Sequence, residues 1–397
     1  MTERREAYIV SAVRTAVGRR NGALAQWRPE ELLAKVLVEV MGRVNVSPKH
    51  VDDVICGIVY QVGEQGFCVA RLAVHAAGFP DEVPGITCNR QCGSSLSALQ
   101  MGSAMIQAGN MDCVIACGVE IMSKYPIGSD WFGLQYAADG RSAGVPFGPT
   151  YIKALGGEII DQGQAAEAIA KKYGITKEEL DTFALRSHQR AHKATVEGRF
   201  KKEILPLETT DPNGKTYIHD KDETIRPDTS MEKLATLKTV FGTACITAGN
   251  SSPITDGSSA VLLMSDTLAK ELKVKPRARV VANVAVGAEP KLMLTGPIPA
   301  TTKVLKKAGL KLKDIDVVEI NEAFAPIPLA WGKEHNPDWE TVNKNGGAIA
   351  IGHPVGNSGT RLTVTALHEL ERVGGRYGLI TLCTGGAMAP ATIIERI

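Results

Sequence analysis

The chain contains an internal repeat, and this repeat limits the folds that it can adopt. Residues 51–57 read VDDVICG and residues 315–321 read IDVVEIN, and each segment follows an expected helix and a short turn. A helix that opens on Cys92 follows the first segment, and a helix that opens at His353 follows the second at nearly the same spacing. Such a repeat indicates two copies of one layered unit. Copies that face each other bring both helix N-termini to one cleft, so we expect Cys92 to lie near His353.

Strands and helices alternate along both copies of the unit. Apolar runs bounded by Gly and Pro predict strands at residues 7–13, 54–60, 84–88 and 113–119. Amphipathic stretches between these runs predict helices at residues 29–43, 66–77 and 92–109. A second run of the same style extends from residue 277 to the end of the sequence. This alternation is typical of an α/β fold built in layers.

The middle of the chain differs in composition from both runs. Between residues 122 and 249, Gly, Pro, Trp and Tyr are mixed with charged residues. Two expected helices, at about 160–173 and 177–198, lie there among irregular stretches. We therefore expect an N-terminal half at residues 1–273 that includes an inserted loop domain at 122–249. A C-terminal half is expected at residues 274–397.

The overall composition argues against several kinds of partner. The 45 Lys and Arg residues nearly balance the 43 Asp and Glu residues, so we expect no nucleic acid and no anionic membrane surface. The eight cysteines lack the spacing of a disulfide scaffold or of a zinc knuckle, which favours a reducing compartment. The sequence shows no apolar signal core and no membrane-spanning segment. A cytoplasmic location is expected, with an organelle as the alternative.

Cys92 is the first candidate for chemistry, because it follows a strand and opens an amphipathic helix. Unpaired backbone N–H groups and the helix dipole favour an anion in the first turn of a helix. We therefore expect a lowered pKa for the Cys92 thiol, which would make it a good nucleophile. Gly93 leaves the backbone open to a substrate carbonyl. The alternative is a buried cysteine that acts only as a small apolar side chain.

Two further segments carry candidate catalytic groups. Residues 346–359 read GGAIAIGHPVGNSG, which places His353 on a glycine-rich turn before a helix. A histidine held there can act as a base and as an oxyanion donor, whereas the alternative is a capping or core histidine. Cys383 ends an expected strand at 379–382 and precedes Gly385. The backbone N–H groups after Cys383 can bind an oxygen, although a plain strand-end turn is the alternative.

Four blocks in order resemble the signatures of the thiolases, the coenzyme A dependent acyltransferases that cleave or form 3-ketoacyl thioesters. The blocks are residues 89–95 (NRQCGSS), 321–324 (NEAF), 346–359 and 383–386 (CTGG). The similarity extends from Tyr8 to Ile397. It implies the thiolase fold, in which two similar βαβαβαββ halves form a five-layered α-β-α-β-α core and carry an inserted loop domain. It also implies a homodimer or a dimer of dimers, and leaves open whether an accessory protein completes the site.

The resemblance also implies a role for each candidate residue. Cys92 carries the acyl group as a thioester in a ping-pong mechanism, and His353 activates the thiol. Asn321 holds a water that stabilises an enolate together with His353. Cys383 exchanges the proton at the substrate α-carbon or at the coenzyme A sulfur. The backbone N–H groups of Cys92 and Gly385 form the oxyanion hole of the acyl-enzyme.

The family's coenzyme A contacts correspond to residues of the loop region and its border. Arg226 and Thr229 match the segment that meets the nucleotide end, and Ser252 matches a serine that contacts the pantetheine arm. Coenzyme A and acyl-CoA are implied as substrates, so neither a permanently bound cofactor nor a metal is expected.

The expected reaction is thiolytic cleavage of a 3-ketoacyl-CoA to acetyl-CoA, or another short acyl-CoA, and a shortened acyl-CoA. Condensation to acetoacetyl-CoA and an inactive lipid-binding subunit are the alternatives. A ketosynthase, which uses one cysteine and two histidines, is disfavoured by Cys383 and the NEAF block.

The sequence departs from the family pattern at three places. Ala387 replaces the third glycine of the last block, and Ser95 replaces a glycine that is common after the nucleophile. Asp161 and Gln162 replace the His-Met pair of the acetoacetyl-specific branch. We expect this last change to widen the acyl pocket toward longer or ring-bearing acyl groups.

Overall fold

The computed structural model describes residues 5–132, 144–210 and 214–397, and its main element is a sheet of 11 described strands. Nine of them form one continuous path in the order β4-β3-β5-β9-β1-β10-β13-β12-β11. The first part of the path contains β4 (Gly85–Cys88), β3 (Asp53–Gly57), β5 (Cys113–Ile121), β9 (Thr255–Ser265) and β1 (Ala7–Thr15). The second part contains β10 (Ala278–Gly287), β13 (Met388–Arg396), β12 (Tyr377–Thr381) and β11 (Val317–Ile320).

The two parts of the sheet repeat one pairing pattern. In the first part, β3 is parallel to β5, and β9 is antiparallel to both β5 and β1. In the second part, β11 is parallel to β12, and β13 is antiparallel to both β12 and β10. The repeat predicted from residues 51–57 and 315–321 is therefore confirmed, since these segments contribute β3 and β11. The two parts meet where β1 pairs with β10 at Tyr8 and Ile9.

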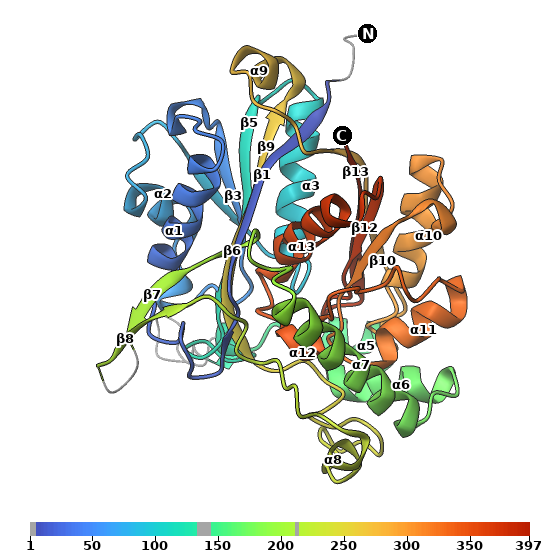
Figure 1. The fold of residues 1–397 in the computed structure, drawn as a ribbon. Helices are drawn as coiled ribbons and strands as arrows, with labels where there is room; N and C mark the ends of the chain where they lie inside the picture. Colours follow the sequence, from blue (N-terminus) through green and yellow to red (C-terminus); the bar gives the residue numbers. More distant parts are fainter. Residues whose placement is uncertain (1–4, 133–143, 211–213) are drawn as a thin grey trace.

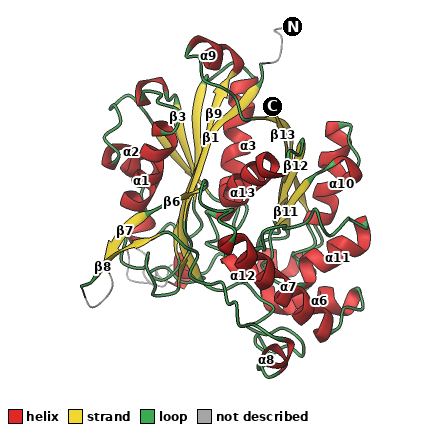
Figure 2. Cartoon of the chain, viewed as in Figure 1, coloured by secondary structure: helices red, strands yellow, loops and turns green. Residues whose placement is uncertain are grey.

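Helices complete five layers around the two parts of the sheet (Figures 1 and 2). The central layer consists of α3 (Ser94–Gln107) and α13 (Ser358–Val373), which pack against each other. One outer layer consists of α1 (Pro29–Gly42) and α2 (Val69–Ala76). The other contains α10 (Pro297–Ala308) and α11 (Pro326–His335). The layered α/β fold expected from the alternation of elements is confirmed.

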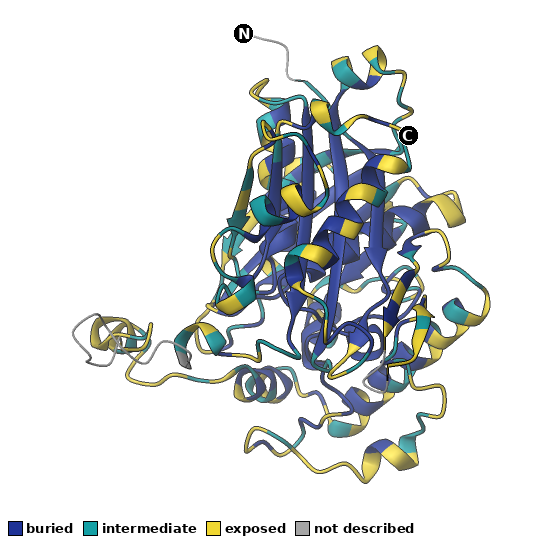
Figure 3. Ribbon diagram, turned by 90° about the vertical axis from the view of Figure 1, so that its left-hand side faces the viewer, coloured by how far each residue is buried: buried dark blue, intermediate teal, exposed yellow. Residues whose placement is uncertain are grey.

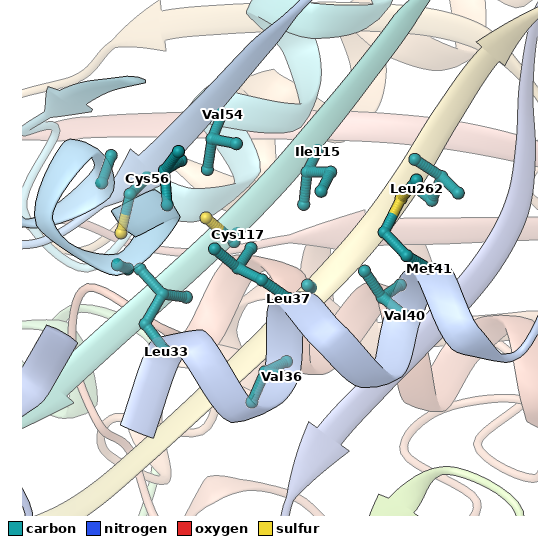
Figure 4. Packing of buried hydrophobic residues seen from close by; sticks show 14 of the residues in the cluster. Leu33, Val36, Leu37, Val40, Met41, Val54, Cys56, Ile115, Cys117 and Leu262 are labelled. Carbon is teal, nitrogen blue, oxygen red and sulfur yellow. The ribbon is translucent and has the colours of Figure 1, made fainter. Parts of the chain in front are cut away.

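Apolar side chains hold the outer helices on the sheet. Figure 4 shows Leu33, Leu37 and Val40 of α1 facing β5 and β9, where Ile115 and Leu262 point back toward the helix. The three α1 residues recur at helical spacing, whereas β5 is buried along its whole length. Burial of each such side chain stabilises the fold by about 1.5–3 kcal/mol. Figure 3 shows the same contrast across the molecule, with buried strands at the centre and exposed loops at the periphery.

The central helices approach each other closely at their N-terminal ends. A Cβ atom at Gly359 of α13 would lie 2.1 Å from the backbone nitrogen of Leu96 in α3, so this position has room only for glycine. Residues 358–370 of α13 are all buried. The structure thus brings the starts of the two repeat helices together.

The segment at residues 122–249 contains the two expected helices, now observed as α6 (Gln162–Lys172) and α7 (Lys177–Val196). Both begin at a capping box, which explains why they start at those positions. Residues 133–143 and 211–213 of the expected insertion lie outside the described residues.

The remaining elements are short. They are α4 (Ser129–Phe132), α5 (Pro149–Ala154), α8 (Met231–Ala235), α9 (Asp266–Glu271), α12 (Ala348–Ile351), β2 (Gly18–Arg19), β6 (Ile204–Leu205), β7 (Leu207–Thr210), β8 (Thr216–His219) and the 3₁₀ turns Pro48–His50, Gly63–Gln65 and Leu312–Asp314. Across the described ranges, no helix is long and apolar enough to span a membrane.

Candidate active site

A strained turn places Cys92 just before α3. Gln91 has a φ of +48°, which is unusual for a residue with a side chain, and its backbone N–H donates to Asn89 Oδ1 at 2.7 Å. Gly93 caps the helix, which begins at Ser94. Cys92 therefore precedes the first turn, and the expectation that its thiol lies within that turn is wrong. The turn nevertheless places the residue beside Val355, in the segment that leads into α13.

The Cys92 thiol is buried, and this burial decides its ionisation. The residue is 5% exposed and packs with Val59, Tyr60, Met122 and Val355. Burial raises the pKa of Cys92 to about 11, although backbone N–H groups of Gly385 and of Cys92 itself favour the thiolate. The expected lowering of this pKa is therefore wrong, because loss of hydration outweighs the nearby backbone donors.

His353 lies in the turn between α12 and α13, and α13 begins only at Ser358, so the expectation that this helix opens at His353 is wrong. The preceding Gly352 has a φ of +105°, and a Cβ atom there would lie 2.6 Å from the Thr255 side chain. The His353 backbone N–H donates to Thr255 Oγ1 at 2.9 Å. Burial, together with the positive charge of Arg361, lowers the pKa of His353 to about 3. The imidazole is therefore neutral at physiological pH.

Asn321 connects His353 with the second cysteine. Asn321 Nδ2 lies 3.3 Å from His353 Nε2, and the amide also hydrogen-bonds the Cys383 side chain. Burial and the neighbouring Cys92 raise the pKa of Cys383 well above its usual value. Within the described part of the chain, Asn321 Oδ1 has no hydrogen-bond partner although it is buried. An acceptor of this kind is suited to hold a water molecule.

The structure brings together all five residues that were predicted to catalyse. Gly385 donates to Cys92, Cys92 interacts with Cys383, and Cys383 is linked through Asn321 to His353. In the described residues, no hydrogen bond joins His353 directly to the Cys92 thiol. Cys92 and His353 are therefore linked through Cys383 and Asn321 and not by a direct hydrogen bond.

Sequence reasoning missed Glu120, a buried carboxylate that ties the site together. It accepts hydrogen bonds from the backbone N–H groups of Val59 at 2.9 Å, Tyr60 at 3.2 Å and Gly356 at 2.9 Å, and from Gln65 Nε2 at 2.8 Å. Burial raises the pKa of Glu120 to about 7. Because its donors come from the segment beside Cys92 and from the turn after His353, it fixes one relative to the other. A glutamate inside an apolar strand was the available sequence signal.

Two departures from the family pattern find a structural explanation. Ser95 fits because Gly118 lacks a side chain, and its Oγ accepts the backbone N–H of Thr360 at 3.0 Å. This bond satisfies a donor in the first turn of α13. Ala387 takes a φ of +57°, the left-handed conformation that a glycine would adopt at less cost.

A cavity of about 170 Å³ contains two of the three expected coenzyme A contacts. Arg226 and Thr229 line it, together with His188 and Lys233. Ser252 is not a lining residue, and its backbone N–H donates to the Ala323 carbonyl at 2.9 Å. The neighbouring Ser251 lines the cavity instead.

Gln162 begins α6 and lies beside the active site. Its Nε2 lies 3.3 Å from the position that a Cβ atom on Gly385 would occupy, and Gln91 Oε1 lies equally close to that position. Two amide side chains therefore lie beside the Cα atom of Gly385. The Phe241 ring covers the adjacent Gly163 and packs against Phe324.

Known proteins resemble this chain over nearly its whole length. The family models described as the thiolase N-terminal and C-terminal domains match residues 7–267 and 274–396. The chain is 46% identical to the steroid 3-ketoacyl-CoA thiolase FadA6 of Mycobacterium tuberculosis, over 99% of this chain and 94% of that protein. It is 42% identical to a 3-ketoacyl-CoA thiolase of Vibrio vulnificus over 98% of each.

A solved structure agrees with these matches. The acetyl-CoA acetyltransferase of Bacillus anthracis superposes with a TM-score of 0.91 at 40% identity, and the match covers 100% of both chains. The fold, the arrangement of the site and the sequence similarity lead to one conclusion: the chain belongs to the thiolase family.

Proposed function

We propose that this thiolase cleaves a 3-ketoacyl-CoA with coenzyme A through an acyl thioester on Cys92. The products are acetyl-CoA, or another short acyl-CoA, and a shortened acyl-CoA. The observation that carries the proposal is the joint burial of Cys92, His353, Asn321 and Cys383 where α3 and α13 begin. A nucleophile (Cys92), a base (His353) and an acid (Cys383) can thus reach one substrate.

The first half-reaction forms the acyl-enzyme. His353 Nε2 takes the Cys92 proton as the sulfur attacks the 3-keto carbon, because a neutral imidazole can act as a base whereas a neutral thiol is a poor nucleophile. The N–H groups of Cys92 and Gly385 stabilise the resulting oxyanion. The bond between C2 and C3 then breaks, which leaves the acyl group on Cys92 and the enolate of acetyl-CoA.

The enolate requires stabilisation and a proton. The protonated His353 ring and a water held by Asn321 Oδ1 donate to the enolate oxygen, and Cys383 delivers a proton to its α-carbon. Free coenzyme A then gives its thiol proton to Cys383 and attacks the thioester on Cys92. The shortened acyl-CoA leaves as the Cys92 sulfur takes back the proton held by His353, so both cysteines return to the thiol form and the imidazole is neutral again.

Coenzyme A binds in the cavity beside α8 in this proposal. Arg226 offers a cation to the phosphates, and Thr229 offers a hydroxyl at the same end. Ser252 is proposed to contact the pantetheine arm, although its side chain is not part of the cavity lining. No metal is assigned, and coenzyme A acts as a substrate.

The acyl group extends toward Gln162 and Gln91. The position of both amides beside Gly385 supports a pocket with a polar rim and without the methionine wall of the acetoacetyl-specific branch. A longer or ring-bearing acyl group that carries a hydrogen-bonding atom suits this rim.

A homodimer is part of the proposal, with a dimer of dimers as the alternative. Among the described strands, β4 pairs only with β3 and forms the edge of the sheet. Ile86 in this strand is 42% exposed, and the nearby Phe67 is 87% exposed. An edge with exposed apolar side chains suits pairing with a second copy. The eight free cysteines support a cytoplasmic location.

Intact mass after incubation with a short acyl-CoA, combined with thiolysis assays, tests the proposed reaction. The wild type should gain one acyl group and should cleave straight-chain, aromatic or steroid-like 3-ketoacyl thioesters with ping-pong kinetics. Cys92→Ala should lose both properties, whereas Cys88→Ala, which removes a neighbouring thiol, should keep the adduct. An adduct on Cys92→Ala would overturn the assignment, and a wild type without any turnover would favour an inactive subunit.

A further inference from the structure

Ser358 is a buried hydroxyl that contacts the His353 ring on the side away from the reacting groups. Ser358 Oγ lies 2.6 Å from His353 Nδ1 and 2.9 Å from the carbonyl oxygen of Pro354. A serine hydroxyl has a single hydrogen to donate but can accept in addition. The direction of these two hydrogen bonds therefore determines which ring nitrogen of His353 carries its proton.

The opposite side of the ring settles this direction. His353 Nε2 faces Asn321 Nδ2 at 3.3 Å, and an amide nitrogen can only donate. Asn321 also favours the thiolate form of Cys383, as a donor does. Nε2 must then be the unprotonated nitrogen, and Nδ1 carries the hydrogen. Ser358 accepts from Nδ1–H and gives its own hydrogen to the Pro354 carbonyl.

We propose that Ser358 is a positioning residue that holds His353 in the tautomer with its proton on Nδ1 and leaves Nε2 free to take the Cys92 proton. This inference rests on the proposed function of His353 as the base. A hydroxyl brings no charge, so it orients the ring and still leaves the imidazole neutral until the thiol attacks. When Nε2 gains the proton, the hydrogen bond from Nδ1–H to Ser358 persists and still holds that side of the ring.

The chain offers a matched control on the same helix. Thr363 Oγ1 donates to the Gly359 carbonyl at 2.9 Å, four residues earlier, as Ser358 does with Pro354. Both side chains are buried in α13. Among the described residues no hydrogen bond joins Thr363 to His353, so Thr363→Val removes a comparable helix bond and leaves those of the base in place.

Nitrogen NMR of the full-length enzyme labelled with ¹⁵N-histidine tests the tautomer directly. His353→Gln identifies the resonances of His353. In the wild type, Nε2 should give the signal of an unprotonated ring nitrogen and Nδ1 that of an N–H. The reverse assignment in the wild type would overturn the proposal, whether or not any variant folds. This readout does not depend on turnover, so it is distinct from a failure of the proposed function.

Kinetics of three variants then test the consequence. Ser358→Ala should lower kcat about tenfold to a hundredfold, because a buried N–H loses its acceptor, with KM for coenzyme A nearly unchanged. Ser358→Thr should recover most of kcat, and Thr363→Val should retain it. In Ser358→Ala, the His353 signals should move toward a mixture of tautomers. Wild-type kcat in Ser358→Ala, or an equal loss in Thr363→Val, would contradict the positioning role.

Discussion

Cys92 and His353 lie in the turns that lead into α3 and α13, yet their pKa values move in opposite directions. Burial raises the pKa of the thiol to about 11 and lowers that of the imidazole to about 3. The physical cause is the same at both places, since a buried site disfavours whichever form of a group is charged. A thiol is charged after it loses a proton, whereas an imidazole is charged after it gains one.

The opposite pKa shifts determine the protonation states of Cys92 and His353 before a substrate binds. Both reagents are neutral at rest, so the site holds no thiolate and imidazolium pair waiting for substrate. The charges appear only when the proton passes from sulfur to nitrogen during attack. The backbone N–H groups of Gly385 and Cys92 are then in place to stabilise the oxyanion that forms on the substrate.

Removal of the base, His353, should have the largest effect on the rate of Cys92 acylation. His353→Ala should slow acylation of Cys92 by roughly two to four orders of magnitude, because general base catalysis is lost. Alkylation of Cys92 by iodoacetamide near neutral pH should change little, since His353 does not create a resting thiolate. Stopped-flow acylation and mass-monitored alkylation measure the two rates. His75→Ala, which alters an exposed histidine, is the control. A parallel collapse of alkylation would mean that the pair is ionised at rest.

The second cysteine should separate acylation from proton transfer. Cys383→Ala should still form the acyl adduct, but its thiolysis rate should fall by roughly two orders of magnitude or more, because the enolate lacks its acid. Rapid-quench mass spectrometry would show the adduct accumulating in the variant. Turnover at the wild-type rate would reduce Cys383 to a structural role.

Glu120 connects the segment beside Cys92 with the turn after His353, and its replacement should loosen both segments. Glu120→Gln exchanges an acceptor oxygen for an NH₂ group that faces other donors, so at least one buried N–H loses its partner. We expect a loss of about 1–3 kcal/mol in the free energy of unfolding and a roughly tenfold fall in kcat. Chemical denaturation and thiolysis assays measure these changes. An unchanged stability would show that the network tolerates the exchange and does not fix the two turns.

The smallest expected effect concerns substrate choice. In the wild type, kcat/KM for a larger 3-ketoacyl-CoA should be well above kcat/KM for acetoacetyl-CoA. Gln162→Met should shift the ratio of these two values toward acetoacetyl-CoA by roughly tenfold. A competition assay that contains both substrates measures the ratio. Lys172→Met, at the far end of α6, is the matched control. A wild-type preference for acetoacetyl-CoA that Gln162→Met leaves unmoved would defeat the wide-pocket proposal.

The sequence predicted the fold because its signals are local or repeated. The strand at residues 53–57 and its copy at 317–320 are apolar runs at matching places, and the capping boxes at Asp161 and Thr176 define helix starts. The glycine-rich blocks also predicted which residues would meet. Each of these features depends on spacing along the chain, which a sequence displays directly.

Other properties of the site depend on what surrounds a residue in space. The direction of the Cys92 pKa was mispredicted because the helix start is visible in the sequence, whereas the depth of burial is not. Glu120 was missed because its partners come from separate segments of the chain. Ser358 lies inside a recognised block, but its role follows from two distances to His353 and Pro354.

The ionisation of Cys92 tests the central claim of a neutral resting pair most directly. Cys92 alkylation rates should be measured against pH in the wild type, with Cys92→Ser as the blank for other thiols. With a neutral resting pair, the rate should rise about tenfold per pH unit from neutral pH upward without levelling off, as a thiol with a pKa of about 11 requires. A plateau that is reached below about pH 8 would instead show a thiolate already formed beside a protonated His353, and the resting pair would not be neutral.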